Sequence, residues 1–318
     1  MKTIKSILKT ALVLALMAGM GHGGHRLAAQ QISHYTQALL NPYLYNPAVA
    51  GTNNYFQMRI ANRLQWIGID DAPVTFNVSC YGPFAKRDMG WGAYITSDNT
   101  GPTGKLSVMG SYAYNLQINK DFRLSGGLAL GMMQYRLDLG SNPAGELPYD
   151  PDDPAILDAA KSKFTPDASI GLYLWNASFN VGFAIHQLFG QKLAFYPEMV
   201  GINRKTRSVL KQHYMLSGGY WVPLNKKWDL ETSLITRLMF GAPIEVEANA
   251  KLSYRERNYE VWGGLSLRWR DAVSLLMGTT VKKKYIIGYS FDWSVMGISR
   301  YNAGSHEIMV GYLFDKLK

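Results

Sequence analysis

The sequence lacks the features that mark several large classes of protein. Its one cysteine, Cys80, rules out an intramolecular disulfide. Beyond the first twenty residues no apolar run approaches about 18 residues, so the sequence predicts no transmembrane helix. It also contains no H-E-x-x-H zinc motif, no G-x-S-x-G nucleophile motif and no G-x-x-x-x-G-K-[ST] phosphate loop. These absences argue against the common zinc proteases, α/β-hydrolases and P-loop nucleotide-binding proteins.

The reactive side chains that are present form no recognisable catalytic set. None of the six histidines has the spacing of a zinc site. His213 stands near the start of a predicted strand, where it could meet a serine as in a barrel lipase, but no feature selects that serine. We interpret His306 and Glu307 as structural and Cys80 as an inert thiol within a strand. We therefore expect no enzyme, no cofactor and no metal site.

One long predicted loop is acidic. It carries four aspartates among several prolines: Asp150, Asp152, Asp153 and Asp158. Clustered carboxylates can bind calcium, but their spacing does not match an EF-hand loop. We therefore favour a solvated acidic loop.

The N-terminus has the pattern of a secretory signal peptide. Lys2, Lys5 and Lys9 precede the apolar run 11–20, and the small residues Ala28 and Ala29 suit signal-peptidase cleavage. The apolar run is too short to span a bilayer, which takes about 20 residues. The sequence therefore predicts a signal peptide over residues 1–29.

The formal net charge is +10. The predicted signal peptide holds four of the basic residues and no acids, and the remaining excess is spread along the chain, much of it in short predicted turns. Nucleic-acid binding would instead favour a basic patch interleaved with aromatic residues. We expect no nucleic-acid partner.

Past residue 54 the dominant pattern is a two-residue alternation. Ile244, Val246 and Ala248 alternate with Glu245 and Glu247, and the same pattern recurs over 178–186, 229–238 and 260–269. An apolar-out, polar-in period of two over roughly 9 to 13 residues is typical of a transmembrane strand. A membrane protein without transmembrane helices must satisfy its backbone hydrogen bonds in a closed β-barrel. The sequence therefore predicts an all-β chain, with a transmembrane antiparallel β-barrel over residues 55–318.

About fourteen such segments can be counted. They are expected to begin near residues 55, 74, 89, 105, 122, 167, 177, 212, 228, 244, 259, 271, 284 and 305. After every second strand the connector is short and polar, and the two longest connectors, 140–166 and 189–211, belong to the other set. Short periplasmic turns and long extracellular loops are the usual asymmetry of such barrels. With an even number of strands, the start of the first strand and the end of the last strand should therefore both be periplasmic.

Aromatic residues gather near the predicted strand ends. They include Tyr55, Trp66, Trp175, Tyr220, Trp221, Trp228, Trp269 and Trp293. This placement suits two interfacial girdles, where amphipathic rings prefer the headgroup level. Core packing in a soluble β-sandwich is the alternative, but it explains the girdles poorly.

The residues between the signal peptide and the first strand follow no alternation. Proline restricts the preceding residue to extended conformations, so Pro42 and Pro47 predict a rigid, irregular tract over 41–51. We expect residues 30–54 to form a periplasmic or lumenal segment. This segment could plug the lumen, contact a periplasmic partner or only connect the signal peptide to the first strand. The candidate partner contacts are Asn41, Pro42, Tyr45, Asn46 and Pro47.

Several motifs resemble one family along the whole mature chain. They are QISHYTQ (31–37), NPYLYNPAVAG (41–51), NRLQWIG (62–68), APVT (72–75), SDNTGP (97–102), YAY (112–114), IGYSFD (287–292) and YNAGSHEIM (301–309). In this order they resemble the PorP/SprF family of type IX secretion and gliding proteins. The chain departs from the family by lacking a Pro-Ser before Gly241 and an acidic start near Ser33.

The resemblance implies a non-enzymatic outer-membrane barrel of the protein-export machinery. Its implied partners are outer-membrane lipids with either a periplasmic ring lipoprotein and a peptidoglycan-binding protein, or a secreted surface adhesin. We favour the ring-associated role on analogy alone. A passive diffusion porin remains the alternative, since inward polar residues such as Glu245, Lys251 and Arg268 permit an aqueous lumen. A surface lipase is a third hypothesis.

Overall fold

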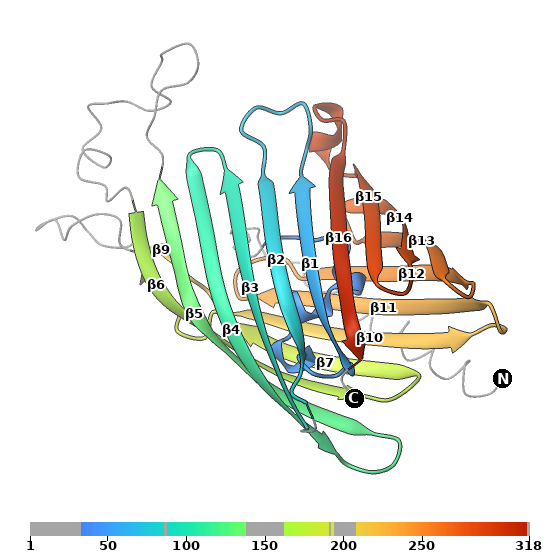
Figure 1. Cartoon of the computed structure of the whole chain (residues 1–318). Helices are drawn as coiled ribbons and strands as arrows, with labels where there is room; N and C mark the ends of the chain where they lie inside the picture. The colour runs from blue at the N-terminus through green and yellow to red at the C-terminus, as the bar shows by residue number, and fades with distance from the viewer. Residues whose placement is uncertain (1–32, 86–87, 138–161, 191, 194–207, 317–318) are drawn as a thin grey trace, which may run out of the picture.

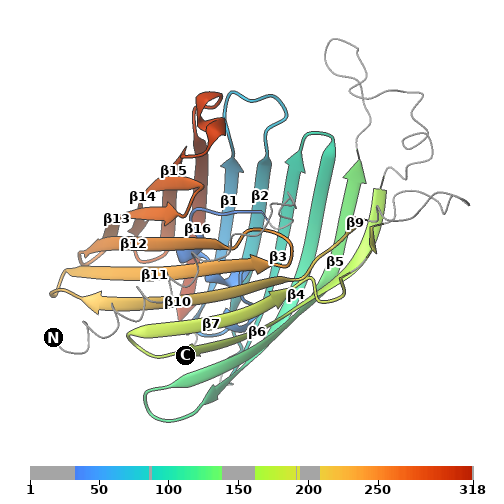
Figure 2. The same ribbon diagram turned by 180° about the vertical axis from the view of Figure 1, so that it is seen from behind.

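A computed structural model describes residues 33–85, 88–137, 162–190, 192–193 and 208–316. The predicted signal peptide and the acidic loop with Asp150 to Asp158 lie outside the described residues. Within them, fourteen strands close into one antiparallel barrel (Figures 1 and 2). The strand count predicted from the alternation is therefore confirmed.

Each barrel strand pairs with both of its neighbours. The barrel strands are β1 (Tyr55–Leu64), β2 (Val74–Pro83), β3 (Met89–Thr100), β4 (Thr103–Gln117), β5 (Arg123–Leu137), β6 (Ser162–Trp175), β7 (Phe179–His186), β10 (His213–Pro223), β11 (Trp228–Met239), β12 (Glu245–Arg255), β13 (Tyr259–Arg268), β14 (Ala272–Val281), β15 (Tyr285–Ser294) and β16 (Ser305–Lys316). The wall closes where β1 pairs with β16, from Gln57 opposite Leu313 to Leu64 opposite His306. A separate two-stranded sheet, β8 (Lys192–Leu193) with β9 (Ser208–Val209), belongs to the β7–β10 connector.

The alternation seen in the sequence sorts side chains between the two faces of the wall. On β13, Leu265 and Leu267 are exposed on the outer face, whereas Ser266 and Arg268, which alternate with them, are buried in the lumen. On β12, Glu247 and Asn249 are buried inside while Leu252 faces outward. An outer surface of exposed apolar side chains around a polar interior is the arrangement expected in lipid.

The two ends of the barrel differ in their connectors. At one end, here called the turn end, every connector between barrel strands has three to five residues. The other end, the loop end, carries the two long connectors between β5 and β6 and between β7 and β10. Tyr55 pairs with Lys316, so the first and last strands meet at the turn end. Since short turns are typically periplasmic, we assign the turn end to the periplasm and the loop end to the outside.

The aromatic girdles are partly as predicted. Tyr220, Trp228, Trp269 and Trp293 are exposed on the outer face near strand ends. Trp175 and Trp221 are a correction, because by the alternation of β6 and β10 they face the lumen. Tyr220 and Trp221 are consecutive, so a strand cannot direct both toward lipid.

Residues 33–54, here called the lumenal segment, lie inside the barrel (Figure 1). They contain three short 3₁₀ turns: η1 (Ala38–Leu40), η2 (Pro42–Leu44) and η3 (Pro47–Val49). Pro42 and Pro47 each open a turn, where the missing N–H costs nothing. A fourth turn, η4 (Gly297–Arg300), lies in the β15–β16 loop. No helix of the described residues is long and apolar enough to cross a membrane.

Candidate functional site in the barrel lumen

The lumenal segment descends through the barrel from one end toward the other. Thr36 lies beside Arg63 and Glu307, which stand where β1 ends and β16 begins, near the loop end. Gly51 lies against Gly90 and Asn115, near the turn end. The segment thus threads the lumen before it enters β1 at Tyr55.

The loop-end part of the segment is held by buried charges. The backbone N–H of Thr36 donates to Glu307 Oε2 at 2.7 Å, and Thr36 Oγ1 donates to Asp292 at 2.7 Å. Arg63 binds Asp292 through Nη2 at 2.7 Å and lies 3.5 Å from Glu307. Gln37 Nε2 donates to the Glu307 carbonyl at 3.0 Å. Buried ions are tolerated only when paired and hydrogen-bonded, and the segment supplies part of that pairing.

The ionic network continues along the wall. Glu247, fully buried, accepts from Arg237 at 2.9 Å and lies 3.6 Å from Arg268. Arg268 also pairs with Asp271 at 2.7 Å. His34 of the lumenal segment reaches Glu245 at 3.3 Å. Burial lowers the pKa of His34, although Glu245 opposes this shift, so the imidazole is neutral at neutral pH and this contact is a hydrogen bond.

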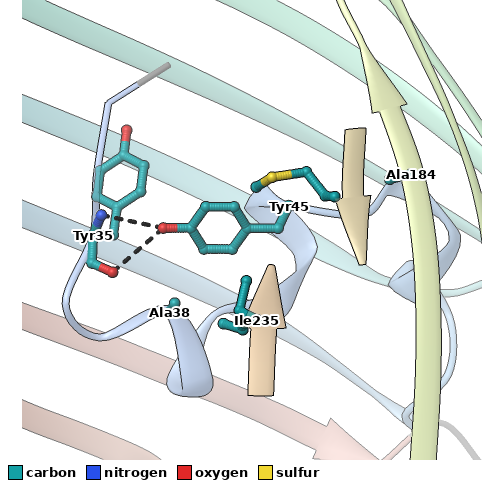
Figure 3. Packing of buried hydrophobic residues seen from close by; sticks show 6 residues of the cluster. Tyr35, Ala38, Tyr45, Ala184 and Ile235 are labelled. Carbon is teal, nitrogen blue, oxygen red and sulfur yellow. Dashed lines mark hydrogen bonds between the residues drawn. The ribbon is translucent and has the colours of Figure 1, made fainter. Parts of the chain in front are cut away.

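An aromatic cluster fixes the middle of the segment (Figure 3). The N–H of Tyr35 donates to Tyr45 Oη at 3.1 Å, and the two rings meet edge to face. The guanidinium of Arg237 lies over the Tyr45 ring at 5.1 Å. Ala38 and Ile235 complete the packing, so η1 and β11 enclose Tyr45. Burial raises the pKa of Tyr45 to about 12, which keeps its hydroxyl protonated.

The turn-end part of the segment is seated against glycines of the wall. A Cβ on Gly127 would overlap the backbone of Ala48, and one on Gly171 would overlap the side chain of Asn46. The same holds for Gly90 against Ala50. Only glycine lets two backbones approach this closely.

Neutral hydrogen bonds complete this turn-end seat. Asn46 Nδ2 donates to the Leu172 carbonyl at 3.0 Å, and its Oδ1 caps η3 by accepting from the N–H of Ala48. Ser125 Oγ donates to the Ala48 carbonyl at 2.6 Å. Asn115 Nδ2 donates to the Gly51 carbonyl at 3.1 Å. The wall therefore satisfies the carbonyls of Ala48 and Gly51, while turn bonds within the segment, such as Val49 N to the Asn46 carbonyl, satisfy other backbone groups of this buried chain.

The sequence model of the family described as "Type IX secretion system membrane protein PorP/SprF" matches residues 27–312. The chain belongs to the PorP/SprF family. It is an outer-membrane β-barrel protein of that family.

Solved structures with a similar barrel are porins and channels. The CymD monoaromatic hydrocarbon channel is 12% identical, with a TM-score of 0.48, and the match covers 93% of this chain and 94% of that one. A FadL homologue from Pseudomonas aeruginosa is 12% identical, with a TM-score of 0.46 and coverage of 85% and 92%. The KdgM porin is 12% identical, with a TM-score of 0.38 and coverage of 81% and 99%. A comparison with curated protein sequences finds no match.

The residues predicted to contact a partner lie in the lumen of this PorP/SprF barrel. Asn41, Tyr45, Asn46 and Pro47 are buried, and Pro42 is half-buried. Asn41 donates to Ser79 at 2.9 Å. Their contact with a partner stays a prediction, and in this arrangement their side chains bind the wall.

The other residues singled out in the sequence are scattered over the PorP/SprF barrel. Nδ1 of His213 lies 3.0 Å from both Gln187 Oε1 and the Lys211 carbonyl. Glu307 is buried in the lumen. His306, the residue before it on β16, lies on the opposite face of the strand, where its Nδ1 is 2.6 Å from the Tyr289 hydroxyl. Cys80 is half-buried. Among the described residues no three metal-binding side chains gather.

Sequence reasoning missed the residues that hold the segment. Arg63, Asp292 and Glu307 lie within the family motifs, but an inward position does not reveal what it touches. Arg63 and Glu307 are direct cross-strand partners, so closure of β1 on β16 was the signal that could have paired them.

Proposed function

We propose that this barrel is a closed, non-enzymatic scaffold of the type IX secretion machinery. It anchors or docks periplasmic ring components, or a secreted adhesin, at the outer membrane. Family membership supports the secretion role. The observation that carries the scaffold role is the lumenal segment. Wall residues bind its backbone near both ends of the lumen, Glu307 at the loop end and Asn115 at the turn end.

A scaffold of this kind needs no cofactor and no catalytic residue. Its wall supplies rigidity, since every barrel strand is paired on both edges. Of the two partner sets, we favour the periplasmic ring lipoprotein with its peptidoglycan-binding partner over a dedicated adhesin. The short turns, the start of β1 and the end of β16 all lie at the turn end, which we assign to the periplasm, and this gives a ring a continuous rim to bind.

Quantitative secretion of several cargoes in a deletion strain tests the proposal. Loss of all type IX cargoes, restored by the full-length chain, is the result expected of a ring-associated scaffold. Loss of one adhesin alone would favour the adhesin-dedicated role. Normal secretion of every cargo would refute both.

The alternative is a passive diffusion porin. Its support is the number of polar inward residues, including Asn249, Ser274 and Ser290, whose side chains contain buried polar atoms without a protein partner within the described chain. A small cavity of about 110 Å³ also remains beside the segment, between η1, Met215 and Ile235. Large, stable unitary conductance of the purified barrel in planar bilayers would favour the porin.

A further inference from the structure

The turn end carries a concentrated positive rim on three adjacent hairpins. These are the turns between β10 and β11, β12 and β13, and β14 and β15, which are neighbours in the barrel (Figure 2). Backbone bonds join the turns, because Arg255 N donates to the Lys227 carbonyl and Lys282 N to the Asn258 carbonyl, both at 2.7 Å. The three turns and the residues flanking them contain seven basic side chains: Lys226, Lys227, Arg255, Arg257, Lys282, Lys283 and Lys284.

Two of these cations are already committed to the barrel. Lys227 binds Glu256 at 2.7 Å and lies over the Tyr254 ring at 5.6 Å. Arg255 pairs with Asp229 and lies over the Trp221 ring at 5.4 Å. Tyr254 shares the outward face of β12 with Leu252, so Lys227 lies at the boundary between membrane and water. Trp221 faces the lumen, so Arg255 is stacked on the inner side of the wall.

Four of the other five cations form a second set. Lys226, Arg257, Lys282 and Lys283 are exposed, and the described part of the chain gives them no ion pair. We call these four the outer rim. Like charges held together in solution repel one another unless an anionic partner compensates them.

The β14–β15 turn places its lysines against the local backbone preference. Lys284 N bonds to the Val281 carbonyl, and both central residues have positive φ, 52° for Lys282 and 57° for Lys283. Such turns strongly prefer Asn-Gly, because a Cβ is crowded in the left-handed region. Two lysines at the positions least suited to them indicate that their charge is used.

From these observations we propose that the outer rim is a docking surface for the acidic face of a periplasmic protein. This inference rests on the proposed scaffold function and names the chemistry of its partner. The turn tip is the part of a hairpin farthest from the membrane, so Lys282 and Lys283 face the periplasm. An anionic phospholipid headgroup would instead meet Lys227, the cation stacked on the outward-facing Tyr254 ring.

The test uses the full-length barrel in nanodiscs of zwitterionic lipid, with a fluorescent poly-L-glutamate peptide as the probe. The variant K226Q/R257Q/K282N/K283G removes the outer rim and gives the β14–β15 turn its preferred Asn-Gly, so misfolding of that turn is not introduced. The matched control is Arg270→Asn, since Arg270 is also an exposed cation with positive φ but lies at the loop end.

We expect the wild type and Arg270→Asn to bind the probe equally and the quadruple variant to bind about tenfold more weakly. Binding should weaken with added salt. Equal binding by the wild type and the quadruple variant would overturn the proposal. The proposal would also be overturned if the quadruple variant bound the probe as well as the wild type but co-purified with less phosphatidylglycerol, because the outer rim would then be a lipid-binding surface.

Complementation of the deletion strain separates this proposal from the proposed function. The quadruple variant should reach the outer membrane at normal abundance but restore secretion several-fold less well than Arg270→Asn. Full restoration by the quadruple variant would overturn the docking surface and leave the scaffold role standing. Normal secretion in the deletion strain itself would overturn the scaffold role.

Discussion

The two ends of the lumenal segment are held by different physical means. At the loop end, Thr36 and Gln37 complete a buried network of charges with Arg63, Asp292 and Glu307. At the turn end, residues 46–51 rest on wall glycines and neutral hydrogen bonds. Charge networks depend on every partner being present, whereas a close-packed seat depends on shape. The loop-end part of the segment should therefore be loosened by a change of pH or by loss of one charge, whereas the turn-end part should stay attached.

The largest expected effect comes from removing the central cation of the loop-end network. Arg63→Met leaves Asp292 and Glu307 buried with less compensation, which should lower the free energy of unfolding by about 3–5 kcal/mol. Urea unfolding in detergent measures this loss. The triple variant R63M/D292N/E307Q removes the stranded charges and should recover much of the stability. If Arg63→Met alone is neutral, the network is not what holds the loop end.

A pair of hydroxyl deletions compares the two ends directly. Thr36→Val removes bonds to a carboxylate and should cost about 1.5–3 kcal/mol, because hydrogen bonds to charged groups are the stronger kind. Ser125→Ala removes one neutral bond to Ala48 and should cost about 1 kcal/mol. The same unfolding measurement serves both variants. A larger loss for Ser125→Ala would reverse the comparison.

Overpacking tests the shape-dependent seat. Gly127→Val forces a side chain into the space of Ala48 and should destabilise by about 1–3 kcal/mol, with faster hydrogen exchange over residues 46–51. Gly126→Val is the matched control, because a Cβ there meets only the Leu172 side chain at 3.9 Å. Equal exchange in the two variants would show that the segment does not depend on this seat.

Acid should loosen only the loop end, and by the smallest amount. Burial depresses the pKa of His34, so the unfolded chain binds a proton more readily than the folded one. The stability from neutral His34 is present above about pH 6.5 and falls as the pH drops from there through the lowered pKa. Exchange near residues 34–37 should rise while exchange at 46–51 does not. His34→Gln should remove the difference, and its persistence would assign the effect to another group.

The wall of the barrel could be predicted from the sequence, because its cause is local. A period of two fixes which side chains face lipid, and most strand starts fall within two residues of the expected positions. The exception is β6, which starts at Ser162 and not near Asp167. Pro166 interrupts the pattern there, since proline usually argues against a strand.

The occupied lumen could be anticipated only in outline. The prolines at 42 and 47 predicted an irregular tract outside the alternation, and a plug was one of its expected roles. The contacts themselves join residues far apart in the chain, such as Thr36 and Asp292. Periodicity shows that Asp292 faces inward but not which segment crosses its path. The same limit hid the roles of Gly90 and Gly171, which appear in the sequence only as glycines within strands.

The central claim is that the lumenal segment blocks the lumen of the barrel, and a measurement of conductance tests this claim most directly. The full-length protein is compared in planar bilayers with a variant in which residues 33–50 are replaced by a Gly-Ser linker of equal length. We predict that the wild type is silent and that the variant shows large, stable unitary conductance, because the lumen loses the chain bonded across it. Equal, large conductance in both proteins would contradict the account and identify an open channel.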